Sequence, residues 1–533
     1  MKVHELVAEA LTASGVSHVF TVMGDGNLDL LDAFARRGVR LVHARHEQGA
    51  VAMADGYARA SGTPGVCSVT HGAGITQTAT SLHTARAYGT PVLLVAGDTP
   101  AADAGRAGAF DQLAFGRLVA GAAWTLQSGG GATAALAAIG ERLRDGPAVL
   151  NLPTDVQRDE AGPGAVPRLM VPPLPRPDPA PAAVERAVAA LGAAARPAIL
   201  AGRGAAGAGA GIALARLADR LGAPIATTLL AHGFCADHPR HVGVSGSLGD
   251  GRGSDALREA DCVYAAGTSL SSWTLGGRPL DAHVVRVDAE PSRLAAGGAD
   301  TPVLADARLA TEQVLAGLGP GRVDRPLPPP RPEPDAFDDG TGTVDPRRAL
   351  LALDRALAPE RRLVIDGGHF AIFASQLLTV HGTAQFGWTS DFGAIGQGLG
   401  IAIGAAIAGP PRTTLVAGDG GFLMAIAELE TAARYAVPLT MFVMNDDGYG
   451  QERHNMRAKG LDASHAVLRT PDLAALAQAT GAAGHRIDSP AALESLAPAL
   501  ADATGPLVLD VRINGDVVNP SSAEIAAALR GEG

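Results

Sequence analysis

Short apolar runs alternate along the whole chain with longer, alanine-rich segments in which apolar positions recur every three or four residues. The short runs are rich in Val, Ile and Leu and end near Gly, Asn, Asp or Pro, which is typical of buried strands. They cover residues 16–22, 39–44, 65–70, 91–97, 147–153, 197–202, 224–230, 261–267, 283–289, 362–368, 413–421, 439–446 and 506–513. Strands that alternate with helices predict an α/β fold of doubly wound parallel sheets. In such sheets ligands bind beyond the carboxyl ends of the strands.

Two proline-rich stretches, residues 171–183 and 325–340, divide the chain. Proline at this density prevents regular structure and forms semi-rigid spacers. The blocks between them have the size of ordinary domains. We therefore predict domains over residues 1–170, 184–324 and 341–533, each with its own doubly wound sheet.

Composition excludes several classes of partner. The 533 residues carry a formal net charge of −11 at pH 7, and both nucleic acids and anionic membranes select basic surfaces. The apolar stretch 398–411 is too short and too rich in glycine to span a bilayer, and the N-terminal residues resemble an amphipathic helix rather than a signal peptide. Three scattered cysteines do not make a disulfide framework or a zinc site. We expect a cytoplasmic protein with no nucleic-acid or membrane partner.

Two aspartates follow neighbouring apolar runs in the third block. Asp419 lies between glycines in VAGDGGF, where we expect a helix to begin near Leu423, and Asp446 follows in MFVMNDDGYG. Their spacing suits a strand–helix–strand unit, which would bring both acids to adjacent strand ends. The surrounding glycines, Gly418, Gly420 and Gly421, let backbone N–H groups approach a phosphate. Two carboxylates with phosphate oxygens suit Mg²⁺. The alternative is two turn acids that never meet, but the pair at this spacing favours a metal site.

At this point the sequence resembles the thiamine diphosphate enzymes of the acetolactate synthase and 2-oxo acid decarboxylase superfamily. Their cofactor motif is G-D-G followed, some two dozen residues later, by N-N or N-D, and it reads GDGGF…MNDDGYG here. The resemblance implies an N-terminal domain that binds the pyrimidine, a middle domain, and a C-terminal domain that binds the diphosphate. By position, Asp419, Asp446 and the carbonyl of Gly448 would hold the metal. Asn445 would start the turn and Asp447 would point elsewhere, while Asp446 stands where relatives often have Asn.

The resemblance also assigns other cofactor contacts. In DFGAIGQGLG, the Gly393 carbonyl would accept the amino group of the cofactor, and Ile395 would be the aliphatic wedge beneath it. The expected contacts in the loops near the diphosphate are Gly368 and His369 of DGGHF, with Tyr449 and Gly450 of DGYG.

Glu47 stands where the apolar run 39–44 meets a helical segment. Alone, it would be an ordinary first-turn acid. In the resemblance it is the glutamate that protonates N1′ of the cofactor pyrimidine, which favours loss of the C2 proton of the thiazolium. Because Glu47 and the metal ligands belong to different domains, the resemblance implies a homodimer or homotetramer with active sites at the dimer interface.

The substrate side combines features of two branches. GDGNLDLLDAF resembles a decarboxylase motif whose catalytic Asp falls on Asp25, and Glu452 matches the catalytic Glu of the same enzymes. Their His-His pair is missing at Ala104 and Gly105, so His71 or His454 would supply a ring instead.

Other segments are more similar to the acetolactate synthase branch, although its substrate-entrance lysine has no counterpart in residues 116–126. The arginine-bearing loop that accompanies FAD in many acetolactate synthases is also absent, so no FAD is expected. GRGAAG at 202–207 has the glycine spacing of a dinucleotide site, but no acid follows the next strand. We read it as a tight turn.

These features favour, by a small margin, decarboxylation of a 2-oxo acid with transfer of the acyl unit to a carbonyl acceptor. Simple decarboxylation to an aldehyde is the alternative. A catalytically silent relative and a nucleotide-binding oxidoreductase remain as different classes, and Glu47 argues against the former.

Overall fold

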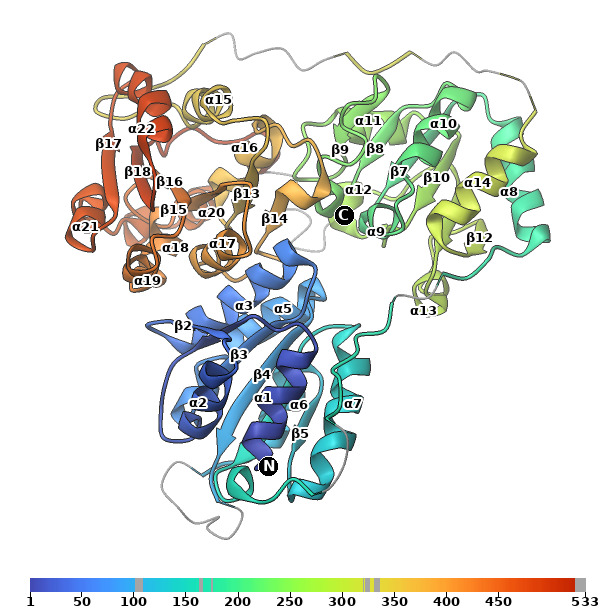
Figure 1. The fold of residues 1–533 in the computed structure, drawn as a ribbon. Coiled ribbons are helices and arrows are strands. Elements are labelled where there is room, and N and C mark those ends of the chain that lie inside the picture. The colour runs from blue at the N-terminus through green and yellow to red at the C-terminus, as the bar shows by residue number, and fades with distance from the viewer. Residues whose placement is uncertain are drawn as a thin grey trace.

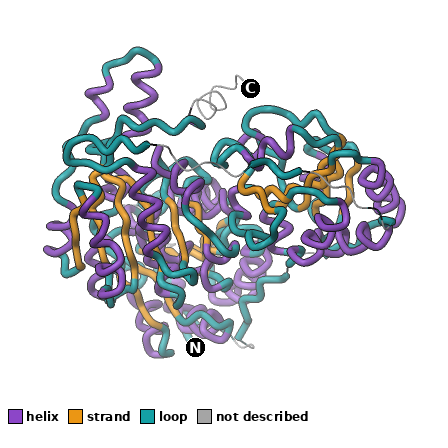
Figure 2. Tube along the Cα trace, turned by 90° about the horizontal axis from the view of Figure 1, so that it is seen from above, coloured by secondary structure: helices purple, strands orange, loops and turns teal. Residues whose placement is uncertain are grey.

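The computed structural model of the chain describes residues 1–100, 109–162, 166–173, 176–319, 321, 326–329 and 336–522. Three bodies are visible, each a six-stranded sheet in which every strand pair is parallel, with helices on both faces (Figure 1). Seen from above, the strands of each body lie between flanking helices (Figure 2). The predicted fold class is confirmed. We propose the boundaries 1–170, 184–324 and 341–533, because each of these ranges contains one complete sheet.

The N-terminal sheet has the order β2-β1-β3-β4-β6-β5. Its strands are β1 (His18–Thr21), β2 (Arg40–His43), β3 (Gly65–Val69), β4 (Val92–Asp98), β5 (Ala123–Thr125) and β6 (Ala148–Pro153). Its helices are α1 (Val3–Ala13), α2 (Leu28–Arg36), α3 (Glu47–Ser61), α4 (Ala73–Thr76), α5 (Ala79–Tyr88), α6 (Gln112–Ala120) and α7 (Ala132–Leu143). The chain reverses its winding between β1 and β3, so the loops after these strands meet at one edge of the sheet.

The middle sheet has the order β12-β11-β10-β7-β8-β9. Its strands are β7 (Pro197–Ala201), β8 (Ile225–Thr227), β9 (His241–Val244), β10 (Cys262–Ala266), β11 (His283–Asp288) and β12 (Thr301–Leu304). Its helices are α8 (Pro181–Ala193), α9 (Arg203–Gly207), α10 (Gly211–Leu221), α11 (Arg252–Arg258), α12 (Ser272–Leu275), α13 (Pro291–Ala295) and α14 (Ala307–Gly317). This is the strand order of dinucleotide-binding domains.

The C-terminal sheet repeats the order of the N-terminal one, as β14-β13-β15-β16-β18-β17. Its strands are β13 (Arg362–Ile365), β14 (Phe386–Trp388), β15 (Thr413–Gly418), β16 (Leu439–Asn445), β17 (Ala483–Ile487) and β18 (Leu507–Arg512). Its helices are α15 (Pro346–Ala356), α16 (His369–Leu377), α17 (Gly398–Ile407), α18 (Asp419–Met424), α19 (Glu428–Arg434), α20 (Gly450–Ala458), α21 (Leu473–Ala479) and α22 (Leu496–Asp502). The helix after β15 begins at Asp419, so the expected start near Leu423 was wrong.

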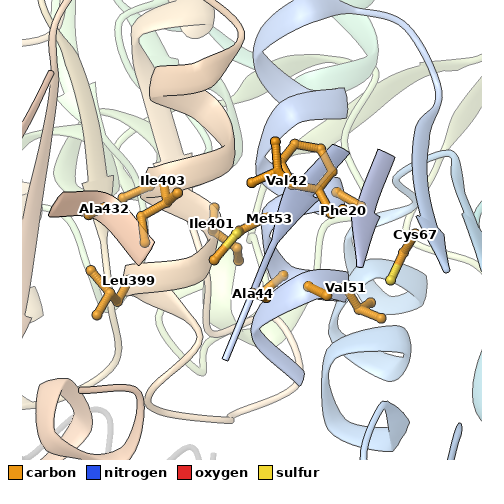
Figure 3. Close-up of a cluster of buried hydrophobic side chains, with 14 of the residues drawn as sticks. Phe20, Val42, Ala44, Val51, Met53, Cys67, Leu399, Ile401, Ile403 and Ala432 are labelled. Carbon is orange, nitrogen blue, oxygen red and sulfur yellow. The ribbon is translucent and has the colours of Figure 1, made fainter. Parts of the chain in front are cut away.

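The N- and C-terminal bodies share one hydrophobic core. A single cluster of buried side chains runs from Phe20 and Val42 through Met53 of α3 to Ile401 and Leu399 of α17 (Figure 3). The two helices pack so closely that a Cβ at Gly56 would lie 1.9 Å from the backbone oxygen of Ile401. Burial of this apolar surface holds the two bodies in a fixed relation. Across the described residues, no helix combines the length and the apolar character needed to cross a membrane.

Candidate active site

The acids predicted to bind a metal lie at the carboxyl ends of two adjacent strands. β15 pairs with β16 from Thr413 through Gly418, so Asp419 and Asp446 leave the sheet side by side. Both side chains are buried, and the charge of Asp419 acts on the carboxyl of Asp446. The winding of this sheet reverses between β13 and β15, which is the position where open α/β sheets bind ligands.

Partners around the acid pair leave one oxygen free. Thr470 donates to Oδ2 of Asp419, while Nη2 of Arg453 donates to Oδ2 of Asp446 over 2.9 Å. Oδ1 of Asp419 is buried and has no hydrogen-bond partner among the described residues. Burial raises the pKa of both carboxyls, and the charge of Asp419 raises the pKa of Asp446 further. Two crowded carboxylates with a buried, unpartnered oxygen form a donor set that a hard divalent cation would satisfy.

The second acid of the MNDDGYG motif points away from the pair, as expected. Asp447 has a positive φ of 63°, and both of its oxygens accept from the guanidinium of Arg512. This hydrogen-bonded ion pair lowers the pKa of Asp447. Asn445 is buried, accepts from Arg512 and donates to Asp510 over 2.7 Å. The two residues therefore anchor the turn that presents Asp446.

Glycines make room around the acids. A Cβ at Gly450 would lie 2.1 Å from Oδ2 of Asp446, and a Cβ at Gly420 would lie 2.7 Å from the Tyr449 ring. Gly448 pairs with Val467 in an isolated antiparallel bridge, which holds the turn after β16 in place. Backbone groups can therefore approach a bound ligand here more closely than side chains would allow, and the residues fit a metal-bound diphosphate.

His369 begins α16 directly after Gly368, on the loop that leaves β13. Its ring is buried and packs against His454 of α20, with 5.1 Å between the ring centroids. Burial, with smaller contributions from His454 and Arg453, lowers the pKa of His369 to about 3, so the ring is neutral. The Nε2 atoms of both rings are buried, and no described residue offers either of them a hydrogen-bond partner. A phosphate oxygen would supply the acceptor that a neutral imidazole N–H lacks.

The segment that precedes α17 crosses the same end of the sheet. Asp366, at the end of β13, accepts from Oγ1 of Thr389 over 2.6 Å and from the backbone N–H of Gly396 over 2.9 Å. Ile395 is held between these contacts, and its side chain lies 3.1 Å from the position of a Cβ on Gly367. Gly393 has a φ of 79°, which a non-glycine residue rarely adopts. Asp366 thus fixes the loop that carries both predicted cofactor contacts.

Glu47 is the first residue of α3, as predicted, and is half-buried. Its Oε1 lies 3.6 Å from the position of a Cβ on Gly74, in the short helix α4 that follows β3. His46 is the N-cap of the helix and accepts from the backbone N–H of Gln48 over 3.1 Å. The carboxylate therefore faces the N-terminal domain, to which Glu47 belongs, whereas Asp419 and Asp446 belong to the C-terminal domain.

Asp25 and His71 meet where the winding of the N-terminal sheet reverses. Oδ1 of Asp25 lies 3.3 Å from Nε2 of His71 and accepts from Thr70 over 3.2 Å. The Asp25 side chain is 68% exposed, whereas that of His71 is only 16% exposed. Glu452 and His454 belong to α20 of the C-terminal body, where Glu452 is exposed and accepts from Asn455. Of the four residues predicted on the substrate side, the structure therefore brings Asp25 and His71 into contact. Ala104 and Gly105 lie outside the described residues.

Two of the three GRGAAG glycines, Gly202 and Gly204, allow close packing in the middle domain. Here the turn opens directly into α9, and a Cβ at Gly204 would lie 2.8 Å from the Cα of Gly267. Beyond the carboxyl ends of the strands of the middle domain lies a cavity of about 500 Å³. It is bordered by Arg203, Arg293 and, from the C-terminal domain, Asp391. Close packing thus accounts for Gly202 and Gly204, whereas a Cβ on Gly207 would meet no atom within 4 Å in the described part of the chain.

Sequence reasoning missed four residues that shape the site. Arg453 and Thr470 donate to Asp446 and Asp419, Arg512 donates to Asp447, and Glu428 contacts the loop before Glu47. Arg453 gave a weak signal, because it follows Asp446 within the same motif. The others act through contacts between distant segments.

Comparison with known proteins agrees with this geometry. Three family models match the chain: the N-terminal TPP binding domain of thiamine pyrophosphate enzymes over residues 1–118, their central domain over 184–314, and their C-terminal TPP binding domain over 366–511. The chain belongs to the thiamine pyrophosphate (thiamine diphosphate) enzymes. The resemblance seen in the sequence is therefore confirmed.

The names of individual relatives state different activities. An acetolactate synthase of Arthrospira platensis is 28% identical and covers 95% of this chain and 93% of its own. A probable 2-ketoarginine decarboxylase of Pseudomonas aeruginosa is 31% identical, and the match covers 90% of this chain and 88% of that protein. The fold matches a solved benzoylformate decarboxylase of Polynucleobacter necessarius with a TM-score of 0.84 and 19% identity, over 97% of this chain and 99% of that one. At this identity, the structural match concerns the fold alone.

Proposed function

We propose that the protein uses thiamine diphosphate and Mg²⁺ to decarboxylate a 2-oxo acid and to transfer the acyl unit to a carbonyl acceptor. One observation carries the proposal: Asp419 and Asp446 form a buried acid pair, with one unpartnered oxygen, at adjacent strand ends of a thiamine diphosphate enzyme. A bound divalent cation would offset the desolvation cost of burying two carboxyls together.

The C-terminal domain would hold the charged end of the cofactor. Asp419, Asp446 and the carbonyl of Gly448 are the metal ligands in this account. Backbone N–H groups at Gly420 and the Nε2–H of His369 would donate to the diphosphate. The crowding at Gly420 and the unpartnered ring nitrogen support these roles.

When bound, thiamine diphosphate supplies a thiazolium carbon that adds to the substrate carbonyl and accepts the electron pair left by CO₂. Glu47 would hold a proton on N1′ of the aminopyrimidine and thereby set the basicity of its amino group. Gly74 leaves space beside the carboxylate of Glu47. Ile395 would support the cofactor from below.

We infer that a second copy of the chain completes the site. Glu47 and the acid pair lie on different sheets. Large apolar side chains are exposed near these groups, in two loops and at the end of α18, with exposed fractions of 53% for Met23, 48% for Phe392 and 54% for Met424. A dimer would cover these side chains and bring Glu47 of one copy to the metal of the other.

On the substrate side, His71 would exchange a proton with the reacting carbonyl while Asp25 orients its ring. The contact of 3.3 Å between the two side chains supports this pairing. Glu452 and His454, from α20, would approach the same place from the other copy. Two acids and two imidazoles could serve either protonation of the product or its release.

The choice between the two reactions rests on the relatives, whose names include an acetolactate synthase and a probable decarboxylase. We expect holoenzyme given a panel of 2-oxo acids, with and without an added aldehyde, to release CO₂ and to form C–C-bonded products. Quantifying CO₂ and all products by NMR tests this. Free aldehyde equal to CO₂ under all conditions would establish simple decarboxylation instead.

A further inference from the structure

A buried glutamate of the C-terminal domain touches the backbone directly before Glu47. Glu428, in α19, is 1% exposed. Its Oε1 accepts from the backbone N–H of His46 over 2.9 Å, and both oxygens accept from the N–H of Arg45, over 3.1 and 3.2 Å. Thr431 donates to Oε2 over 2.7 Å. The carboxylate therefore joins two domains through main-chain atoms.

The fit around this carboxylate is close. A Cβ at Gly49, in the first turn of α3, would lie 2.2 Å from Oε1 of Glu428. Burial raises the pKa of Glu428, so the protein keeps this acid in place against a desolvation cost. Hydrogen bonds from an N-cap backbone and the positive end of a fifteen-residue helix compensate that cost.

The end of α19 also contacts β2, the strand that precedes the loop before α3. Tyr435, next to the end of α19, accepts from the N–H of His43 over 2.9 Å and donates to the oxygen of Leu41 over 3.2 Å. Nη2 of Arg434 donates to the oxygen of His43 over 2.7 Å. Figure 1 shows α19 beside β2 at this junction. Glu47 follows these clamped residues directly.

We propose that Glu428 is a positioning residue: it fixes the first turn of α3 and so sets the direction of the Glu47 carboxylate. The proposal rests on the function proposed for Glu47. It assigns no contact with substrate to Glu428. The C-terminal domain, which would hold the metal, would by this contact also orient the acid of the N-terminal domain in the same chain.

Two variants and a matched control test the proposal. Glu428→Ala removes the acceptor, and Glu428→Gln keeps its shape with weaker acceptance. Glu430→Gln is the control, because Glu430 belongs to the same helix and binds the same loop through an exposed ion pair with Arg45 of 2.6 Å. Glu47→Gln gives the lower limit of activity.

Two readouts separate positioning from general stability. Hydrogen–deuterium exchange of cofactor-free protein should quicken for the amides of residues 43–50 in both Glu428 variants. C2–H exchange of bound thiamine diphosphate, measured at saturation by NMR, should fall about a hundredfold in Glu428→Ala, the loss expected for a displacement of about 1 Å. Glu428→Gln should fall between this value and wild type. Cofactor affinity should stay within a factor of about three, because the diphosphate contacts are unchanged.

The outcomes are distinct. Normal C2–H exchange in Glu428→Gln and Glu428→Ala would overturn the proposal, as would equal losses in Glu430→Gln. If Glu428→Ala does not fold, Glu428→Gln alone decides. Normal C2–H exchange in Glu47→Gln would instead refute the function proposed for Glu47, and the positioning proposal with it.

Discussion

Arg453 should be needed to stabilise the empty metal site, and much less once the metal is bound. Its guanidinium donates to Oδ2 of Asp446 over 2.9 Å, and the exposed fractions of the two side chains are 13% and 3%. Removing one partner of a buried pair costs ~3–5 kcal/mol. We expect the lower value, ~3 kcal/mol, for Arg453→Gln, because Asp446 can take up a proton to relieve its charge. For a domain of this size that loss lowers the unfolding midpoint by roughly 6–12 °C.

The matched control lies on the same helix. Arg457 pairs with Asp516 over 2.7 Å, but the exposed fractions are 49% and 67%, so Arg457→Gln should cost ~0–1 kcal/mol. Calorimetry of cofactor-free protein would measure both variants. Mg²⁺ and thiamine diphosphate are added to all proteins at one fixed concentration, ~100 times the wild-type dissociation constants, which contributes ~2.7 kcal/mol to wild type. Arg453→Gln should gain more than this, because the metal relieves the charge of its unpaired Asp446 and so binds the variant more tightly. Equal losses in the two variants, or no greater recovery by Arg453→Gln than by wild type, would refute the reasoning.

Three further predictions concern other parts of the molecule. Burial raises the pKa of Asp391 to about 6, although Arg59 and Arg203 act to lower it. The folded state therefore loses stability as the pH rises from about 4 to 6. In urea unfolding, Asp391→Asn should be more stable than wild type above about pH 6, by at most ~3 kcal/mol, and as stable as wild type near about pH 4. Asp25→Asn should release about one equivalent of CO₂ per site rapidly and then turn over slowly, which quenched-flow analysis would detect; wild-type steady-state rates would remove Asp25 from the substrate side. Purified protein should be colourless, and a stoichiometric absorption band of oxidised flavin would contradict the reading of the middle domain.

Of the strands in the described residues, the sequence pattern revealed all those inside the three sheets and one edge strand, β2, but missed the other edge strands. All five strands absent from the sequence prediction, β5, β9, β12, β14 and β17, form sheet edges. Each pairs on one side only, and they are three to five residues long with partly exposed side chains. A continuous apolar run appears only where a strand is buried on both faces. Edge strands therefore resemble loops.

The residues of the candidate site likewise fall into those that the sequence reveals and those that it does not. Asp419 and Asp446 could be found because a local motif places each at the end of a predicted strand. Glu428 could not, because it contacts Arg45 across 383 residues of sequence, and no pattern in either segment indicates that the two elements meet. Tertiary packing of α3 against α17 determines that meeting, and only the folded chain shows it.

Cofactor dependence of turnover tests the central claim most directly. Protein treated with a chelator and freed of cofactor should release no CO₂ from a 2-oxo acid. Activity should return only when thiamine diphosphate and a divalent metal are added together, and Asp419→Ala should not recover under the same conditions. Full turnover by treated protein without added metal would contradict the account.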